Sequence, residues 1–108
     1  MRDVMCKMTE TDWMSILNSG VVGSEGGVVL DDEEYKGQCR ITRERCEKYD
    51  AITCGVYGGM VHATFSNQED SFDLLERMKA DLKRFIDADI EDFDDELAFF
   101  EKFVDIYR

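Results

Sequence analysis

The fold is decided by two β-rich runs around a glycine pair: residues 51–66 read AITCGVYGGMVHATFS. Glycine takes positive φ without steric cost, so Gly58-Gly59 between such runs predicts a two-residue hairpin turn, in which Val56 faces Val61. Paired residues share a face, and one predicted face is wholly apolar: Ile52, Cys54, Val56, Val61, Ala63 and Phe65. The other face is mixed: Thr53, Gly55, Tyr57, Met60, His62 and Thr64. The hairpin therefore has one face for a core and one for solvent or a site.

Two further strand candidates lie upstream of this hairpin. Residues 28–30 are apolar and β-prone, and residues 38–46 place Cys39 and Ile41 on one face. Residues 31–34 are all acidic and poor strand material, so we expect a turn or an exposed edge there. These pieces predict an antiparallel meander of three to four strands.

Two helical patterns follow the hairpin. Ser66 and Glu69 have the spacing of a capping box. An apolar stripe follows at three- and four-residue intervals: Phe72, Leu75, Met78, Leu82, Phe85 and Ile86. A last helix is predicted over about residues 91–107.

A short helix is also expected before the strands. Thr9 or Thr11 can cap it, and Gly20 can end it in the left-handed conformation. Residues 20–27 contain four glycines and no lysine, so we expect a flexible connection and not a phosphate-binding loop. The sequence thus predicts one α+β domain over residues 1–108: an antiparallel three- to four-stranded β-meander with a short N-terminal helix and two C-terminal helices packed on one face.

Composition narrows the function. The chain has 108 residues, with 25 acidic and 13 basic side chains and a net charge of −12. This balance opposes binding to nucleic acid or anionic membranes, which needs clustered lysine and arginine, and it favours a basic partner. No apolar run is long enough for a secretory signal or a membrane span, so we expect a cytoplasmic protein. The cysteines are then expected as reduced thiols that pack as small hydrophobes: Cys6, Cys39, Cys46 and Cys54.

A metal site is the first chemistry to consider. Cys39, Cys46, Cys54 and His62 follow one another at nearly even spacing. A tetrahedral zinc site needs its ligands to converge on one point, whereas the predicted register places His62 and Cys54 on opposite faces. We therefore expect no metal and no cofactor, although a shifted register would reopen the metal site.

An enzyme is the less favoured class. His62 is the single histidine, and no nucleophile or orienting carboxylate is predicted beside it. The alternative function that we keep is a small-ligand-binding or enzymatic domain on the mixed sheet face. Arg40, Tyr57 and His62 would line its pocket.

Negative charge is concentrated near the C-terminus, where residues 87–108 hold nine acidic and two basic side chains. Acids in the first turn stabilise a helix, which accounts for two or three of them. We predict that the surplus binds a basic partner, with residues 31–34 as a secondary surface. The predicted partner-binding residues are Asp87, Asp89, Glu91, Asp92, Asp94, Asp95 and Glu96. The leading prediction is a non-enzymatic, inhibitor- or immunity-like interaction module that associates by electrostatic steering.

Two features leave alternatives open. A local excess of basic side chains surrounds residues 40–45: Lys36, Arg40, Arg43, Arg45 and Lys48. They either pair with acidic groups of the same chain, including the acidic helix, or of a second subunit, or they protect an exposed strand edge from aggregation, and the edge role is favoured. The last helix carries five rings: Phe93, Phe99, Phe100, Phe103 and Tyr107. These rings are either buried within the chain or form a homodimer interface, and neither alternative is favoured.

Overall fold

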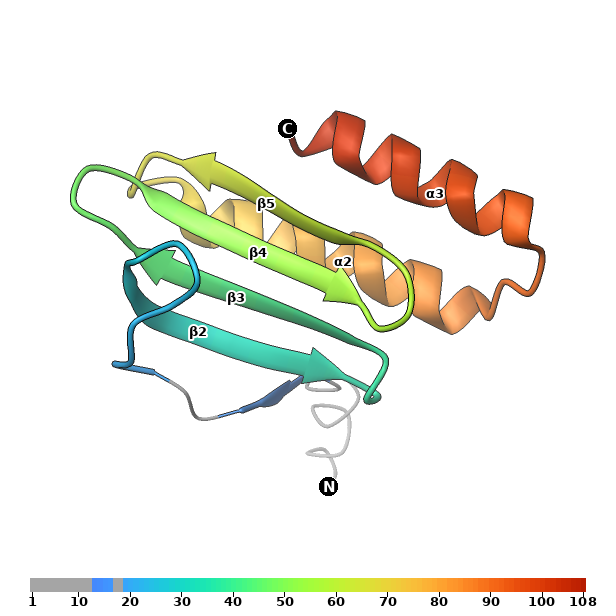
Figure 1. Cartoon of the computed structure of the whole chain (residues 1–108), viewed down its shortest axis with the longest axis horizontal. Coiled ribbons are helices and arrows are strands. Elements are labelled where there is room, and N and C mark those ends of the chain that lie inside the picture. Colours follow the sequence, from blue (N-terminus) through green and yellow to red (C-terminus); the bar gives the residue numbers. More distant parts are fainter. Residues whose placement is uncertain (1–12, 17–18) are drawn as a thin grey trace, which may run out of the picture.

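The strands lie side by side in the order in which they occur along the chain (Figure 1). The computed structural model describes residues 13–16 and 19–108. The elements are β1 (Trp13–Ser15), β2 (Val28–Tyr35), β3 (Cys39–Arg45), β4 (Asp50–Val56), β5 (Val61–Ser66), α2 (Ser71–Ala88) and α3 (Phe93–Ile106). Neighbouring strands are antiparallel. The predicted α+β class is confirmed, with five strands among the described residues in place of three or four.

The expected N-terminal helix is wrong where the structure describes that segment. Trp13–Ser15 forms strand β1, which pairs with the end of β2, and the ring centroids of Trp13 and Tyr35 lie 5.3 Å apart. Ile16 extends the pairing, because its N–H donates to a β2 carbonyl oxygen at 2.7 Å. Strand pairing and ring packing outweigh the helical spacing of Trp13 and Ile16. The candidate caps before residue 13 lie outside the described residues.

The acidic residues 31–34 also differ from the prediction, because they belong to strand β2. Three of them have cationic partners within the chain: Asp31 pairs with Arg43, Asp32 with Arg40 and Glu33 with Lys79. Two of these partners, Arg40 and Arg43, lie on the neighbouring strand β3, and Lys79 lies on α2. Low intrinsic β-propensity is overridden when such partners are present. Since these carboxylates are used inside the chain, the secondary partner surface predicted there loses its support.

The β4–β5 hairpin is present, but its register is one residue away from the prediction. Cys54 pairs with His62, and three residues form the turn instead of two. The Gly59 N–H donates to the Val56 carbonyl oxygen at 2.8 Å, and of the glycine pair only Gly58 has a positive φ, 80°. The predicted two-residue turn assumed that conformation for both glycines. A shift of one residue exchanges the faces of a whole strand.

The new register separates the residues predicted to share one apolar face. Ile52 and Cys54 point to the core, whereas Val61 and Phe65 lie on the other face, with 81% and 54% of their surface exposed. His62 and Thr64 take the inner positions of β5 instead.

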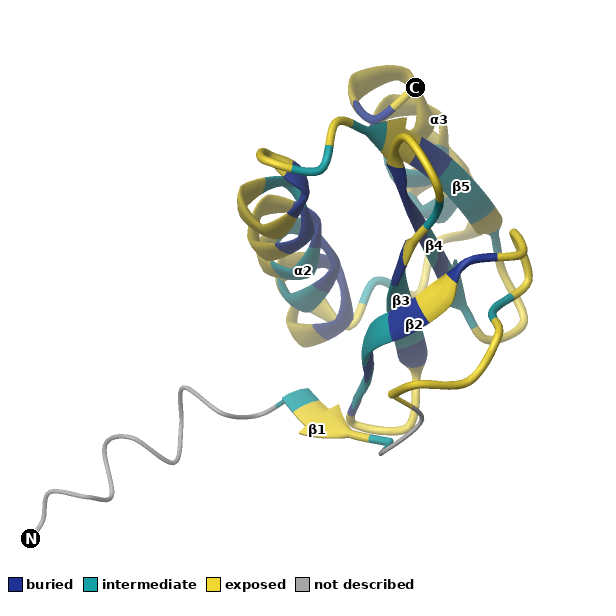
Figure 2. Cartoon of the chain, turned by 90° about the vertical axis from the view of Figure 1, so that its left-hand side faces the viewer, coloured by how far each residue is buried: buried dark blue, intermediate teal, exposed yellow. Residues whose placement is uncertain are grey.

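Helix α2 covers one face of the sheet, and no described helix covers the opposite face (Figures 1 and 2). We call this opposite side the open face. Side chains of the sheet and of α2 form the core: Tyr35, Cys39, Ile41, Ile52, Cys54, Leu75, Met78, Leu82, Phe85 and Ile86. Helix α3 lies beyond β5 in Figure 1 and adds Phe103 and Tyr107 to the same core.

The predicted apolar stripes locate the two helices more accurately than the predicted capping residues do. Helix α2 begins at Ser71, five residues after the predicted cap Ser66, because the Asn67 side chain accepts the Asp70 N–H and holds a turn before the helix. Helix α3 begins at Phe93, close to the predicted start. Within the described residues, neither helix combines the length and the apolar character that crossing a membrane requires.

Candidate functional site

The open face carries a cavity of about 560 Å³, which we call the open-face cavity. Its floor is formed by strand residues that include Arg40, Thr42 and Thr53, and its wall by the loop segment 21–24. Figure 1 looks onto this face, with α2 behind the sheet and the loop before β2 in front of it. Of the mixed face proposed for a pocket, Thr53, Gly55 and Tyr57 line this cavity, whereas His62 and Thr64 lie on the inner face.

The buried Asp32 carboxylate binds the guanidinium of Arg40, which lines this cavity. Asp32 is 3% exposed and accepts hydrogen bonds from Arg40 Nε at 2.8 Å and Nη2 at 2.6 Å, while Thr42 Oγ1 donates at 3.1 Å. The hydrogen bond with Asp32 raises the pKa of Arg40 above its ordinary value, so the guanidinium stays charged. The Arg40 side chain is nevertheless 42% exposed, and the rest of the guanidinium remains available to a ligand.

Thr53 brings an unused polar group to the floor of the cavity. It lies opposite Thr42 in the β3–β4 pairing. Its Oγ1 is buried and has no hydrogen-bond partner among the described residues. A buried hydroxyl without a partner is unfavourable, so a bound group that completed its hydrogen bonding would be stabilised.

A second buried carboxylate fixes the loop that forms the wall. Glu44 is fully buried and accepts the backbone N–H groups of Gly27 at 2.8 Å and Glu25 at 3.1 Å. A Cβ atom at Gly23 would lie 2.6 Å from the Glu44 carboxylate, so only glycine fits there without movement. The glycine-rich segment is therefore attached to the sheet and is not a free linker.

Two of the three residues predicted to line a pocket lie together. Arg40 and Tyr57 both line the open-face cavity, and the Tyr57 hydroxyl donates to Glu34 at 2.6 Å. His62 lies on the opposite face, where Nε2 donates to the Tyr107 carbonyl oxygen at 2.5 Å. The prediction for His62 is wrong because the hairpin register differs by one residue.

The same register change brings Cys54 and His62 to one face, against the prediction that separated them. Nevertheless, no three metal-binding side chains of the described residues gather closely enough to hold an ion. Burial raises the pKa of the Cys39 thiol to about 11 and that of Cys54 to about 12. These two thiols therefore stay protonated and unreactive at neutral pH.

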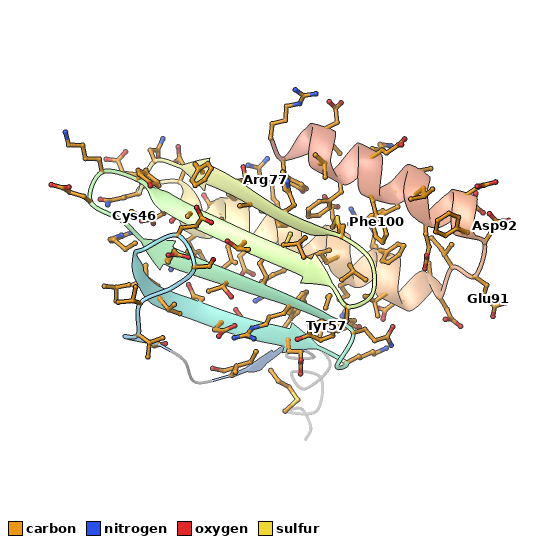
Figure 3. The ribbon with its side chains drawn as sticks, viewed as in Figure 1. Cys46, Tyr57, Arg77, Glu91, Asp92 and Phe100 are labelled. Carbon is orange, nitrogen blue, oxygen red and sulfur yellow. The ribbon has the colours of Figure 1, made fainter. Side chains whose placement is uncertain are left out.

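The predicted partner-binding residues gather where α2 passes into α3. Figure 3 shows Glu91 and Asp92 at this end of the molecule. Asp87 is occupied, since it accepts from the Tyr35 hydroxyl at 2.7 Å and from Lys36 at 3.0 Å. These two hydrogen bonds lower the pKa of Asp87. Asp92 caps α3 by accepting backbone N–H groups of the first turn.

The six carboxylates of residues 89–96, which we call the acidic end, have no cationic partner in the part of the chain that the structure describes. They are Asp89, Glu91, Asp92, Asp94, Asp95 and Glu96. All are exposed except Glu96, which is half-buried. Helix α3 also exposes Phe93 and Leu97 beside them, by 68% and 40%.

The remaining rings of α3 turn toward the chain. Phe99 stacks on Phe85 with 4.3 Å between centroids, and Phe103 packs on Tyr107 at 4.7 Å. Intrachain burial therefore accounts for Phe99, Phe103 and Tyr107. A homodimer through the outer side of α3 stays a prediction.

The basic residues 40–45 belong to β3, which is an inner strand, so the favoured role in protecting an edge is wrong. Their arginines pair within the chain, with carboxylates of β2 and β4 and not with the acidic helix: Arg40 with Asp32, Arg43 with Asp31 and Arg45 with Asp50. The three arginines of β3 are thus each paired with a carboxylate of a neighbouring strand.

Sequence reasoning missed the two buried carboxylates that shape the open face, Asp32 and Glu44. The sequence offered one signal for the buried position of Glu44: it is an acidic residue in the same β-prone run as Cys39 and Ile41. Its partners are backbone groups about 17 residues away in the chain, and no residue pattern encodes them.

Comparison of the chain with protein-family models, with curated proteins and with solved structures finds no match.

Proposed function

We propose that this protein is a non-enzymatic interaction module, inhibitor- or immunity-like, that binds a basic protein partner through its acidic end. The observation that carries the proposal is the group of six carboxylates of residues 89–96, which have no ion-pair partner among the described residues and lie beside the exposed side chains of Phe93 and Leu97. Apolar anchors surrounded by charged groups are the usual anatomy of a protein interface.

The placement of charge supports this function physically. Cations in the sheet and on α2 pair with nearby carboxylates, whereas the acidic end stays uncompensated among the described residues. We therefore expect a strongly negative potential around the acidic end. Such a field accelerates encounter with a positively charged surface and makes association sensitive to salt.

The experiment compares partner capture by two variants with equal net charge. The test variant carries Glu91→Gln, Asp94→Asn and Asp95→Asn, which spare the Asp92 cap. The control variant carries Glu47→Gln, Glu69→Gln and Asp73→Asn, at exposed positions outside the acidic end. We expect the wild type and the control to retain one basic protein at low salt and to release it at high salt, and we expect the test variant to lose it. Capture that is independent of salt, or equal in both variants, contradicts the proposal.

A second candidate function is a small-ligand site in the open-face cavity, which the unpartnered Thr53 hydroxyl and the exposed part of Arg40 favour. Thr53→Val removes the hydroxyl at nearly constant shape, so the free protein should be as stable as the wild type or more stable. In a thermal-shift screen of small metabolites, a compound that stabilises the wild type and not Thr53→Val supports this function. A screen without any such compound argues against it.

A further inference from the structure

A groove of about 310 Å³ lies between the β2–β3 turn, Tyr57 and the junction of α2 with α3. Phe85, Ile86 and Ile90 contribute apolar lining, and Asp89 and Glu96 contribute two carboxylates. Tyr57 lines both this groove and the open-face cavity. Asp89 and Glu96 belong to the acidic end, so the groove borders it.

The two carboxylates give the groove its charge. Neither Asp89 nor Glu96 forms an ion pair with a described residue. Lys36, which precedes the groove residue Gly37, is bonded to Asp87 at 3.0 Å instead. No cationic side chain lines the groove among the described residues. A group that enters it therefore meets two negative charges above an apolar floor.

The end of α2 fixes the backbone of one of these two residues. Asp89 ends α2 in the left-handed conformation, with φ 52° and ψ 52°, and its N–H donates to the Ile86 carbonyl oxygen at 3.1 Å. Glycine and asparagine are the residues that this position ordinarily favours. Aspartate also tolerates this conformation, so Asp89 can end the helix and line the groove.

We propose that this groove binds one arginine side chain of the basic partner, which makes the groove the specific anchor of the interface; the proposal rests on the proposed function. The apolar floor suits the methylene stem of the side chain. The two carboxylates suit a planar guanidinium with several donors, and the exposed Tyr57 ring offers a face for it to stack on.

Other occupants fit the same groove less well. An anion would be repelled by Asp89 and Glu96. An apolar side chain would bury both carboxylates without a partner, which is strongly unfavourable. Lysine lacks the planar group that can contact two carboxylates and a ring together.

The first experiment uses a defined probe, N-acetyl-arginine methylamide, followed by backbone amide NMR. N-acetyl-citrulline methylamide is the control, because it has a similar shape without the charge. We expect arginine to shift the amides of Gly37, Tyr57 and Asp89 with a dissociation constant on the order of millimolar, and citrulline to leave them unchanged. Equal shifts with both probes, or no shifts at these amides, overturn the proposal.

The second experiment separates the groove from the general charge of the acidic end. One double variant carries Asp89→Asn and Glu96→Gln, in which asparagine still suits the left-handed position. The matched variant carries Glu91→Gln and Asp95→Asn, which remove the same charge outside the groove.

We expect the groove variant to weaken partner binding roughly tenfold more than the matched variant, because charge-assisted hydrogen bonds are lost in addition to long-range attraction. Equal losses in both variants overturn the groove and leave the proposed function standing. If the wild type binds no basic partner and arginine still shifts the groove amides, the proposed function falls and the groove remains an arginine site.

Discussion

Glu44 is the residue on which the open face depends most. Its carboxylate is fully buried and is held by backbone N–H groups of the loop, Glu25 and Gly27, and by no cation that the structure records. The Gly27 N–H has the shorter of these hydrogen bonds, in a buried setting. One side chain of the sheet thereby determines where the wall of the open-face cavity stands.

Replacing this carboxylate should destabilise the protein clearly. For Glu44→Ala we expect the free energy of unfolding to fall by about 3 kcal/mol, because two backbone donors lose their acceptor. Urea unfolding of the variant measures the loss, and Glu47→Ala, at an exposed position, should change stability by less than about 0.5 kcal/mol. A loss equal to that of the control would mean that water replaces the carboxylate.

Asp50 predicts how stability depends on pH. Burial alone would raise the pKa of Asp50, but hydrogen bonds from Arg45 at 2.9 and 2.8 Å and from Ser71 at 2.5 Å outweigh it and lower the pKa. A carboxyl whose pKa is lowered by folding stabilises the protein above its unfolded pKa, about 3.9, and this contribution disappears as the pH falls through the lower folded pKa.

We therefore expect Asp50→Asn to be less stable than the wild type at pH 7 and the difference to shrink as the pH falls below about 4. Urea unfolding at a series of pH values measures the two curves, with the exposed Glu69→Gln variant as the control. Parallel curves for the wild type and Asp50→Asn from pH 7 to pH 3 would show that Asp50 acts only by packing.

Among the elements, those with a repeated apolar pattern were the ones that could be predicted. The predicted stripe from Phe72 to Ile86 lies in the core from Leu75 onward, as its spacing required, whereas Phe72 is 52% exposed. The hairpin runs around Gly58 were also found, but the register was not, because turn length depends on which glycine adopts positive φ. Because the register differs by one residue, His62 lies outside the predicted pocket, whereas Arg40 and Tyr57 line the open-face cavity. Long-range partners, such as the loop donors to Glu44, have no local signal at all.

Helix α3 packs one face against the core and exposes the other face to solvent, where a partner could bind. We expect Phe103→Ala, at a position 2% exposed, to lower the free energy of unfolding by about 3–5 kcal/mol, because a buried ring leaves a cavity. Phe93→Ala, at a position 68% exposed, should change it by less than about 0.5 kcal/mol and should weaken partner capture instead. Chemical denaturation and the capture assay measure the two effects. Equal destabilisation by both substitutions would contradict this division of the helix.

At the scale of the molecule, charge is distributed unevenly. The net charge is −12, yet the arginines of β3 pair with carboxylates of β2 and β4. The acidic end has no such partner among the described residues. Repulsion between its carboxylates opposes the compact state, while the same charges attract a basic partner.

Salt should therefore act in opposite directions on folding and on binding. Raising NaCl from about 20 mM to 500 mM shortens the Debye length from roughly 20 Å to about 4 Å, which weakens long-range repulsion more than the ion pairs of the partly buried sheet. We expect the thermal midpoint of the free protein to rise by a few degrees and partner affinity to fall at least tenfold. The Glu91→Gln, Asp94→Asn, Asp95→Asn variant should start from a higher midpoint and gain less from salt, since part of the repulsion is already removed. A wild-type midpoint that falls with salt would contradict this prediction, because it would show that screening of the sheet ion pairs outweighs screening of the repulsion at the acidic end.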